Sequence, residues 1–355
     1  MYSKKGLASF RCARVGCGFV ATLVAMAPQP SHAVEGGVSY WVPGFFGSLA
    51  ATPQQPGFAF ATVFYHPSVD AGADVAFARQ VTRGRLNANF TGNLNIDLNG
   101  RADLVLLAPG YTFAEPLLGG QANISVAVPV ARSRGEVNAA LSGAVGPFPF
   151  TISGAASDTV TGFGDMAPMF SLRWNAGVHN FMTYVATDIT VGRYDPDRLA
   201  NLGLGHTALD GGGAYTYFNP ESGNEFSATL GLTYNFMNDF TQYKNGIDLH
   251  LDLGASHFVT KQWQIGAVAY VYQQLTCDSG AGDRVGCFES RVLGIGPQIG
   301  YIFPIGEHLQ GYFNLKGYKE FAEDHRAADW NVWLTFAISP AAPTPPATQA
   351  PMVRK

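Results

Sequence analysis

Apolar and polar residues alternate one by one along much of the chain, most clearly between residues 86 and 98. Leucine, alanine, phenylalanine, glycine and isoleucine fill the even positions from Leu86 to Leu98, whereas asparagine, threonine and aspartate fill the odd positions. Successive side chains of a β-strand point to opposite faces, so this pattern predicts a strand with one apolar and one polar face. Asn99 and Gly100 follow. Because this dipeptide favours type I′ turns, we expect a hairpin into a returning strand at 101–113.

The same alternation recurs at 224–236, 246–257 and 329–338, and the apolar positions of these segments carry no charged residue. The segments are longer than the average soluble strand of about five or six residues and match the roughly 9–11 that a tilted strand needs to cross a bilayer. A basic side chain on a lipid-facing position costs about 2–4 kcal/mol near the midplane. The pattern therefore favours an all-β fold, a transmembrane antiparallel β-barrel, over the alternative of a secreted β-sandwich.

The predicted barrel spans residues 58–338. Alternation is weakest in the first candidate strand and at 134–155, so the expected count is fourteen strands, with twelve as the alternative; both are even, as in single-chain bacterial barrels. In the C-terminal half, tight turns alternate with longer connections, which predicts short periplasmic turns and longer outer loops. The candidates are 58–66, 86–98, 101–113, 121–131, 134–155, 165–175, 180–192, 208–218, 224–236, 246–257, 262–275, 288–303, 309–321 and 329–338.

The first 33 residues have the organisation of a secretory signal peptide. Four basic residues precede an apolar stretch at 15–27, and small residues at Ser31 and Ala33 predict cleavage after Ala33. Cleavage would leave 22 − 4 = 18 basic residues against 26 acidic ones, a formal net charge of −8. We therefore expect an exported, acidic protein of the bacterial outer membrane, without the basic surface that nucleic-acid binding requires.

Two segments lie outside the predicted barrel. Residues 34–57 contain Trp41, Phe45 and Phe46 among proline and glycine, and two interpretations stay open: a plug inside the lumen or an ordered periplasmic lead-in. Residues 339–355 are rich in proline and predict an extended periplasmic tail.

Cys277 and Cys287 are the two cysteines left after export, and a loop rich in glycine and aspartate separates them. In an oxidising compartment this spacing predicts a disulfide that staples an outer loop. It would stabilise the fold by about 2–3 kcal/mol at most. A metal or redox pair is the alternative, but the loop lacks a CxxC spacing and histidine partners, so no metal site is predicted.

Two further groups of residues are candidates for contact with solutes or lipid. Asp248, His250 and Asp252 share one face of a predicted strand and are lumen or ligand candidates, with a hydrated lumen wall as the alternative. Trp263, Phe303 and Trp330 lie beside predicted turns or loops, where aromatic girdles anchor a barrel at the membrane interfaces. No catalytic residues and no cofactor are predicted.

Almost the whole exported chain resembles the outer-membrane family labelled "protein involved in meta-pathway of phenol degradation", the phenol MetA degradation or SphA-like transporter family. The resemblance lies in residues 35–44, 160–165, 171–184, 194–201 and 311–320 and in the loop between the cysteines. It implies an outer-membrane channel for passive uptake of small hydrophobic or aromatic compounds, with no catalytic residues.

Two alternatives to transport remain at this stage. A barrel enzyme acting on lipids or esters would use the polar trio around His250, and a non-transporting structural or adhesion barrel would use the stapled outer loop. The partners expected for the channel are small hydrophobic or aromatic solutes and outer-membrane lipid. The oligomeric state stays open.

Overall fold

The computed structural model describes residues 40–83, 86–145, 148–283, 287 and 289–342. The predicted signal peptide, its cleavage site after Ala33 and residues 343–355 of the predicted tail lie outside these residues. Within the described part of the chain, no helix is long and apolar enough to cross a membrane.

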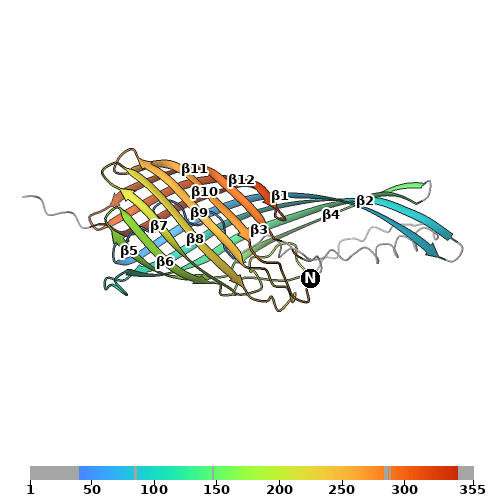
Figure 1. Ribbon diagram of the computed structural model, residues 1–355, viewed down its shortest axis with the longest axis horizontal. Helices are drawn as coiled ribbons and strands as arrows, with labels where there is room; N and C mark the ends of the chain where they lie inside the picture. Colours follow the sequence, from blue (N-terminus) through green and yellow to red (C-terminus); the bar gives the residue numbers. More distant parts are fainter. Residues whose placement is uncertain (1–39, 84–85, 146–147, 284–286, 288, 343–355) are drawn as a thin grey trace, which may run out of the picture.

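The described residues form thirteen antiparallel strands, and twelve of them close into a barrel (Figure 1). The strands are β1 Gly57–Arg83, β2 Leu86–Thr112, β3 Gln121–Val145, β4 Phe148–Phe163, β5 Ala167–Ala176, β6 His179–Thr187, β7 Ala208–Asn219, β8 Asn224–Asn235, β9 Asp248–Phe258, β10 Trp263–Gln274, β11 Arg291–Ile305, β12 Leu309–Asp324 and β13 Ala328–Pro340. The first and last strands pair, with Phe60 opposite Ile338, and this pairing closes the wall. The prediction of an antiparallel barrel is confirmed, at the lower of the two strand counts.

The expected hairpin at Asn99 and Gly100 is wrong. Both residues lie inside the continuous strand β2, where Gly100 is opposite Val69 of β1 and Gly135 of β3. The candidates 86–98 and 101–113 are therefore one strand of 27 residues. Alternation continues unbroken through Gly100, and pairing on both sides holds the backbone extended against the local turn preference.

The candidate strand 134–155 is also wrong, because the chain there belongs to two strands. Its first part is the end of β3, which stops at Val145, and its second part is the beginning of β4, which starts at Phe148. β4 pairs with β3 alone among the described strands, while β5 takes over the same edge of β3 at Ala167. β4 therefore lies outside the closed ring of twelve.

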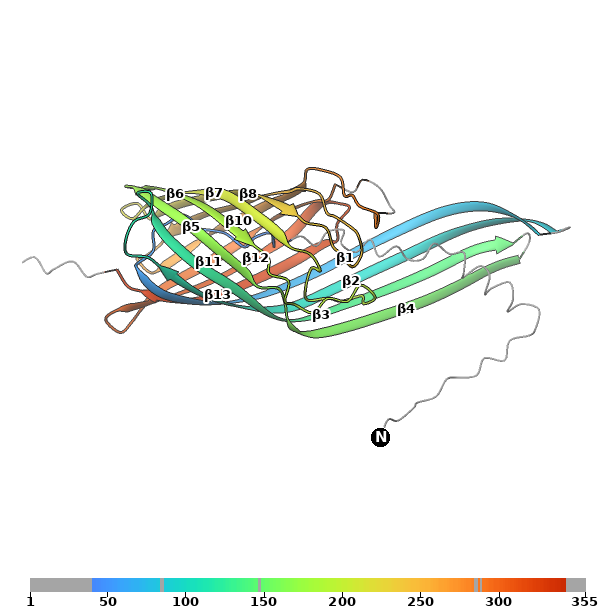
Figure 2. The same cartoon turned by 90° about the horizontal axis from the view of Figure 1, so that it is seen from below.

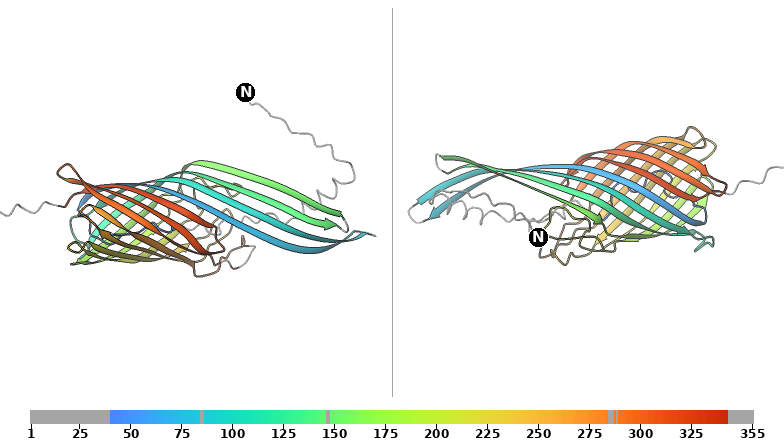
Figure 3. Two further views of the ribbon diagram at one scale, coloured as in Figure 1. Left: turned by 90° about the horizontal axis from the view of Figure 1, so that it is seen from above. Right: turned by 180° about the vertical axis from the view of Figure 1, so that it is seen from behind.

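Strands β1 to β4 extend well beyond the other nine. From residue 71 onward β1 has β2 as its only partner in the described sheet. We call residues 71–83, 86–98, 137–145 and 148–156 the arm; these ranges are in register with one another. At about 3.3 Å per residue, the longest arm strands reach roughly 40 Å past the barrel. Figures 2 and 3 show the arm as a curved sheet projecting from one end.

The two ends of the barrel differ in their connections. At the end where β1 begins and β13 stops, strands β5 to β12 are joined by the short turns 177–178, 220–223, 259–262 and 306–308. At the opposite end, from which the arm projects, connections include 188–207, 236–247 and 275–290. We call these the short-turn end and the long-loop end.

The barrel wall has its apolar side chains outside and its polar side chains inside. In β8, Thr229 and Thr233 are buried, whereas Leu230 and Leu232, which lie between them, are about half exposed, at 51% and 48%. This arrangement reverses that of a soluble protein and suits a barrel whose outer surface contacts lipid. The interior is correspondingly lined by carboxylates, amides and hydroxyls.

Candidate functional site in the barrel lumen

Residues 40–56 lie inside the barrel and contact several strands of its wall. Asp252 of β9 accepts hydrogen bonds from the backbone N–H groups of Gly44 (2.8 Å) and Phe46 (3.4 Å). From β12, Lys316 Nζ donates to the carbonyl oxygens of Phe46 (2.9 Å) and Phe45 (3.3 Å) and also to that of Gly44. A buried carboxylate and a buried ammonium thus hold the same turn of this lumen segment, which we define as residues 40–56.

Further hydrogen bonds to the wall fix the C-terminal part of the lumen segment. Leu49 N donates to Glu225 Oε1 at 2.9 Å and to Ser227 Oγ at 3.0 Å, both on β8. Ala51 N donates to Thr216 Oγ1 at 3.1 Å. A Cβ on Gly254 of β9 would lie 2.6 Å from the backbone nitrogen of Ser48, so only glycine lets the segment approach the wall there.

His250 is at the centre of a buried polar group on β6, β7, β8 and β9. Its Nε2 lies 2.9 Å from Asp210 Oδ2 and 3.4 Å from the hydroxyl of Tyr184. Thr233 donates to the same Asp210 oxygen at 2.6 Å. The indole of Trp41 stacks on the imidazole with ring centroids 3.8 Å apart. The histidine is 1% exposed, so no solute can reach it while Trp41 stays in place.

An aromatic cluster lines the lumen on the other side of the segment. Tyr270, Tyr318 and Trp333, from β10, β12 and β13, are buried together, and the ring of Phe45 packs edge-on to Trp333 at 6.4 Å. Tyr65 of β1 lies over Trp333, with centroids 4.0 Å apart. The lumen therefore offers both a polar wall and a set of aromatic faces.

The polar trio predicted from the sequence faces inward, and all three residues are already bonded. As described above, Asp252 accepts hydrogen bonds from the lumen segment, and His250 is hydrogen-bonded to Asp210. Asp248 accepts from Asn235 Nδ2 at 2.9 Å and from the Tyr272 hydroxyl at 2.8 Å. The three side chains are 2% exposed or less, so they are structural members of the wall in this conformation. A role in binding a ligand stays a prediction.

The three aromatic residues predicted at the membrane interfaces lie near the ends of the barrel. Trp263 begins β10 at the short-turn end, is 43% exposed and lies 4.4 Å from Tyr301. Phe303 is near the end of β11, with its ring stacked 5.5 Å from Tyr301. Trp330 is near the beginning of β13 and is 40% exposed. Anchoring in the interface stays a prediction for all three.

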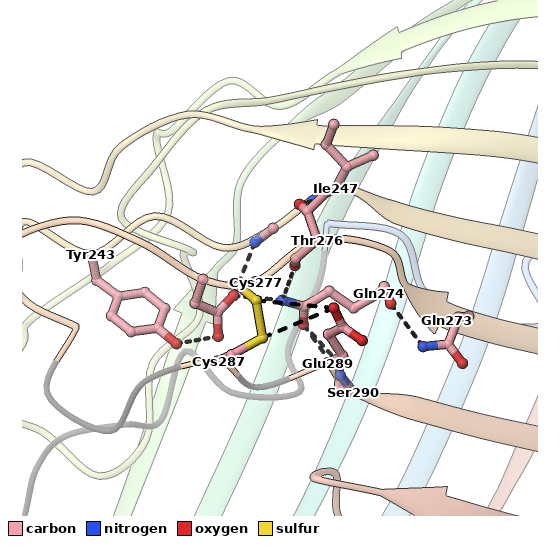
Figure 4. Close-up of a disulfide and its surroundings, with 11 residues drawn as sticks. Tyr243, Ile247, Gln273, Gln274, Thr276, Cys277, Cys287, Glu289 and Ser290 are labelled. Atoms are coloured by element: carbon pink, nitrogen blue, oxygen red, sulfur yellow. Dashed lines mark hydrogen bonds between the residues drawn. A yellow bond between two sulfur atoms is a disulfide. The ribbon is translucent and has the colours of Figure 1, made fainter.

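Cys277 and Cys287 form a disulfide in the loop between β10 and β11 (Figure 4). Next to it, Asp278 accepts hydrogen bonds from Gly246 N at 2.9 Å and Gln274 Nε2 at 2.7 Å, and from the Tyr243 hydroxyl. These contacts dock the stapled loop on the loop between β8 and β9.

The loop 188–207 packs on the base of the arm through buried and paired carboxylates. Arg198 donates to both oxygens of Asp158 on β4, at 2.9 and 2.6 Å, and thereby lowers the pKa of that carboxyl. Asp165 accepts from the N–H groups of Gly192 and Leu204. Asp188 is buried near Asp165, and burial together with the neighbouring charge raises its pKa to about 8.

Comparison with known proteins agrees with this geometry. The family described as "Putative MetA-pathway of phenol degradation" matches residues 71–336. The chain belongs to this family. The family relationship was also inferred from the sequence, and it is confirmed.

The fold is that of known outer-membrane channels. The COG4313 outer membrane channel from Pseudomonas putida F1 superposes with a TM-score of 0.55 at 13% identity, covering 85% of this chain and all of that one. A FadL homologue from Pseudomonas aeruginosa gives 0.44 at 12% identity, covering 86% and 96%. A search among curated proteins found no matching sequence.

Sequence reasoning missed several residues that organise the lumen. Lys316, Asp210 and Glu225 each contact the segment or the histidine group from a separate strand. The available signal was the alternation of inward and outward side chains along a strand. It places Lys316 on the inward face of β12, where a buried ammonium requires a partner. Alternation identifies such a residue as inward-facing but does not say which strand faces it.

Proposed function

We propose that this protein is an outer-membrane channel for passive uptake of small hydrophobic or aromatic compounds, with its long-loop end outside the cell. The lumen segment narrows the pore, so that solutes pass between it and the wall rather than through an open channel. The main supporting observation is that Asp252 of β9 and Lys316 of β12, three strands apart in the wall, hold this segment inside the barrel, and that an aromatic cluster packs beside it. The family description, which refers to phenol degradation, supports an aromatic solute.

The aromatic cluster gives the selectivity a physical basis. Stacked and edge-to-face arrangements of aromatic rings contribute about 0.5–1.5 kcal/mol beyond the burial of their area. Tyr270, Tyr318 and Trp333 are buried beside the lumen segment, so they would offer such faces to a planar solute when the segment moves away from them. The mature chain's predicted excess of acidic groups would disfavour anions if those groups border the path.

Uptake and conductance together test the proposal. Intact cells lacking their main porins, with and without this protein, would be given a radiolabelled phenol at low concentration, because a glycolipid outer leaflet slows hydrophobic solutes more than a liposome does. Planar-bilayer recording of the purified protein would measure ion passage. We expect faster phenol uptake and small, infrequent conductance events. A folded, inserted protein with neither aromatic flux nor conductance would refute the channel.

A further inference from the structure

The outward face of β1, β2 and β3 changes from apolar to charged at one level near the long-loop end. Phe64, Val105 and Val130 are register partners and form an apolar row that continues the lipid-facing surface. Two residues further along each strand, the corresponding row is His66, Asp103 and Arg132. A change at the same register position on neighbouring strands marks where the apolar surface ends.

Arginines concentrate directly above this boundary. Arg101 of β2 is the register partner of Arg134 of β3, one row beyond Arg132, and all three side chains are exposed. Arg134 pairs with Glu136, and Asp103 pairs with His66 at 2.7 Å. Among the described residues, no ion pair involves Arg101 or Arg132. An arginine costs about 2–4 kcal/mol at the midplane but close to zero near the interface.

The level of these arginines is that of lipid headgroups. From Val105 to Arg101 the strand advances four residues, about 13 Å. The planar guanidinium offers paired N–H donors that match two phosphate oxygens, which makes arginine suited to phosphate recognition. At the long-loop end of β8, by contrast, the outward residues are aromatic, Tyr234 and Phe236 among them, so the barrel end is not basic all round.

Above the arginines, the same outward face of the arm carries a shallow hollow, in which polar side chains alternate with alanine and glycine. Its volume is about 290 Å³, and Asn95 and Asp97 of β2, Asn138 of β3 and Ser153 of β4 contribute to its lining. Amide, carboxylate and hydroxyl groups on a flat surface are the side chains that hydrogen-bond sugar hydroxyls. Apolar rows, arginines and this hollow follow one another along a single face.

We propose that this face binds a phosphorylated glycolipid of the outer leaflet. The acyl chains lie on the apolar rows of the wall, Arg101 and Arg132 bind the phosphate groups, and the hollow on the arm receives the sugars. The proposal rests on the membrane orientation stated above, with the long-loop end outside, but not on the identity of the transported solute. The bound glycolipid would also contact the arm at the level where the arm leaves the bilayer.

Binding of lipid A to the purified full-length protein in detergent tests the site. The variant would combine Arg101→Gln and Arg132→Gln, and the control would be Lys261→Gln, which removes a positive charge in the turn 259–262 at the short-turn end. Each basic residue near an anionic lipid surface contributes about 1 kcal/mol, so we expect roughly a thirtyfold loss of affinity in the variant and little change in the control. Heat-modifiable migration on gels would verify that each variant is folded.

Two lipid controls separate the headgroup chemistries. We expect the wild-type protein to bind dephosphorylated lipid A as weakly as the arginine variant binds lipid A. Phosphatidylglycerol carries a phosphate but no sugar, and we expect the wild-type protein to bind it more weakly than lipid A. Asn138→Ala with Ser153→Ala should reduce this preference for lipid A. Wild-type affinity in the arginine variant, or equal affinity for phosphatidylglycerol and lipid A, would overturn the proposal.

Discussion

Replacing Lys316 by methionine should loosen the lumen segment and open the pore more often. Lys316→Met keeps the length of the apolar stem and removes the ammonium that contacts three consecutive carbonyl groups, those of Gly44, Phe45 and Phe46. A hydrogen bond to a charged group contributes about 1.5–3 kcal/mol, so the Gly44 and Phe46 contacts together account for roughly 3–6 kcal/mol. At 1.4 kcal/mol for each factor of ten, the detached fraction should rise at least about a hundredfold.

Single-channel recording measures this change as the frequency and size of open events. Lys319→Met is the matched control, because Lys319 is an exposed lysine on the same strand that pairs with Asp329 and not with the segment. Gly254→Ala gives an independent perturbation with no change of charge, since its Cβ would meet the backbone of Ser48. If both Lys316→Met and Gly254→Ala record like the wild type, residues 40–56 do not limit passage and the reasoning fails.

Three further outcomes can be measured on the purified protein. Gly231→Ala should lower the unfolding temperature by an amount equivalent to about 1–3 kcal/mol, because its Cβ would lie within 2.5 Å of the side chains of Tyr184 and His250. The control Gly213→Ala, at an outward-facing position, should leave the unfolding temperature unchanged. Reducing the Cys277–Cys287 disulfide should destabilise the loop between β10 and β11 by at most about 3 kcal/mol, read as faster cleavage in limited proteolysis; an unchanged rate would contradict this. Asp188 has a pKa raised from 3.8 to about 8 in the folded protein, so its burial costs stability progressively as pH rises from about 4 to 8. Asp188→Asn should therefore be more stable than wild type above pH 8 and equal to it below pH 4 in denaturant titrations.

Much of the fold follows from alternation, because a lipid-facing barrel requires one apolar and one polar face on each strand. The segments 224–236, 246–257 and 329–338 correspond closely to β8, β9 and β13. Alternation of apolar and polar residues does not encode where a strand ends. For this reason the sequence predicts two strands, 86–98 and 101–113, where the structure has the single strand β2. Nor does alternation encode that one strand, β3, ends at Val145 and the next, β4, begins at Phe148.

The site was predictable only in part, for a physical reason. Asp248, His250 and Asp252 could be placed on a polar face because they share one strand. Their partners come from residues distant in sequence, such as Gly44, which is 208 positions from Asp252. Contacts between a chain segment and the inside of a closed wall depend on the strand register all round the barrel, and a periodicity of two carries no information about that register.

Pairing of the first strand with the last has a consequence for how the protein assembles. Phe60 and Ile338 are 338 − 60 = 278 residues apart, so the wall cannot close until the final strand is in place. The lumen segment precedes β1 and touches β8, β9 and β12, which means its contacts form late although its residues are synthesised early. The lumen segment can therefore complete its contacts only after β12 has joined the wall, so weakening those contacts should affect a late step of assembly.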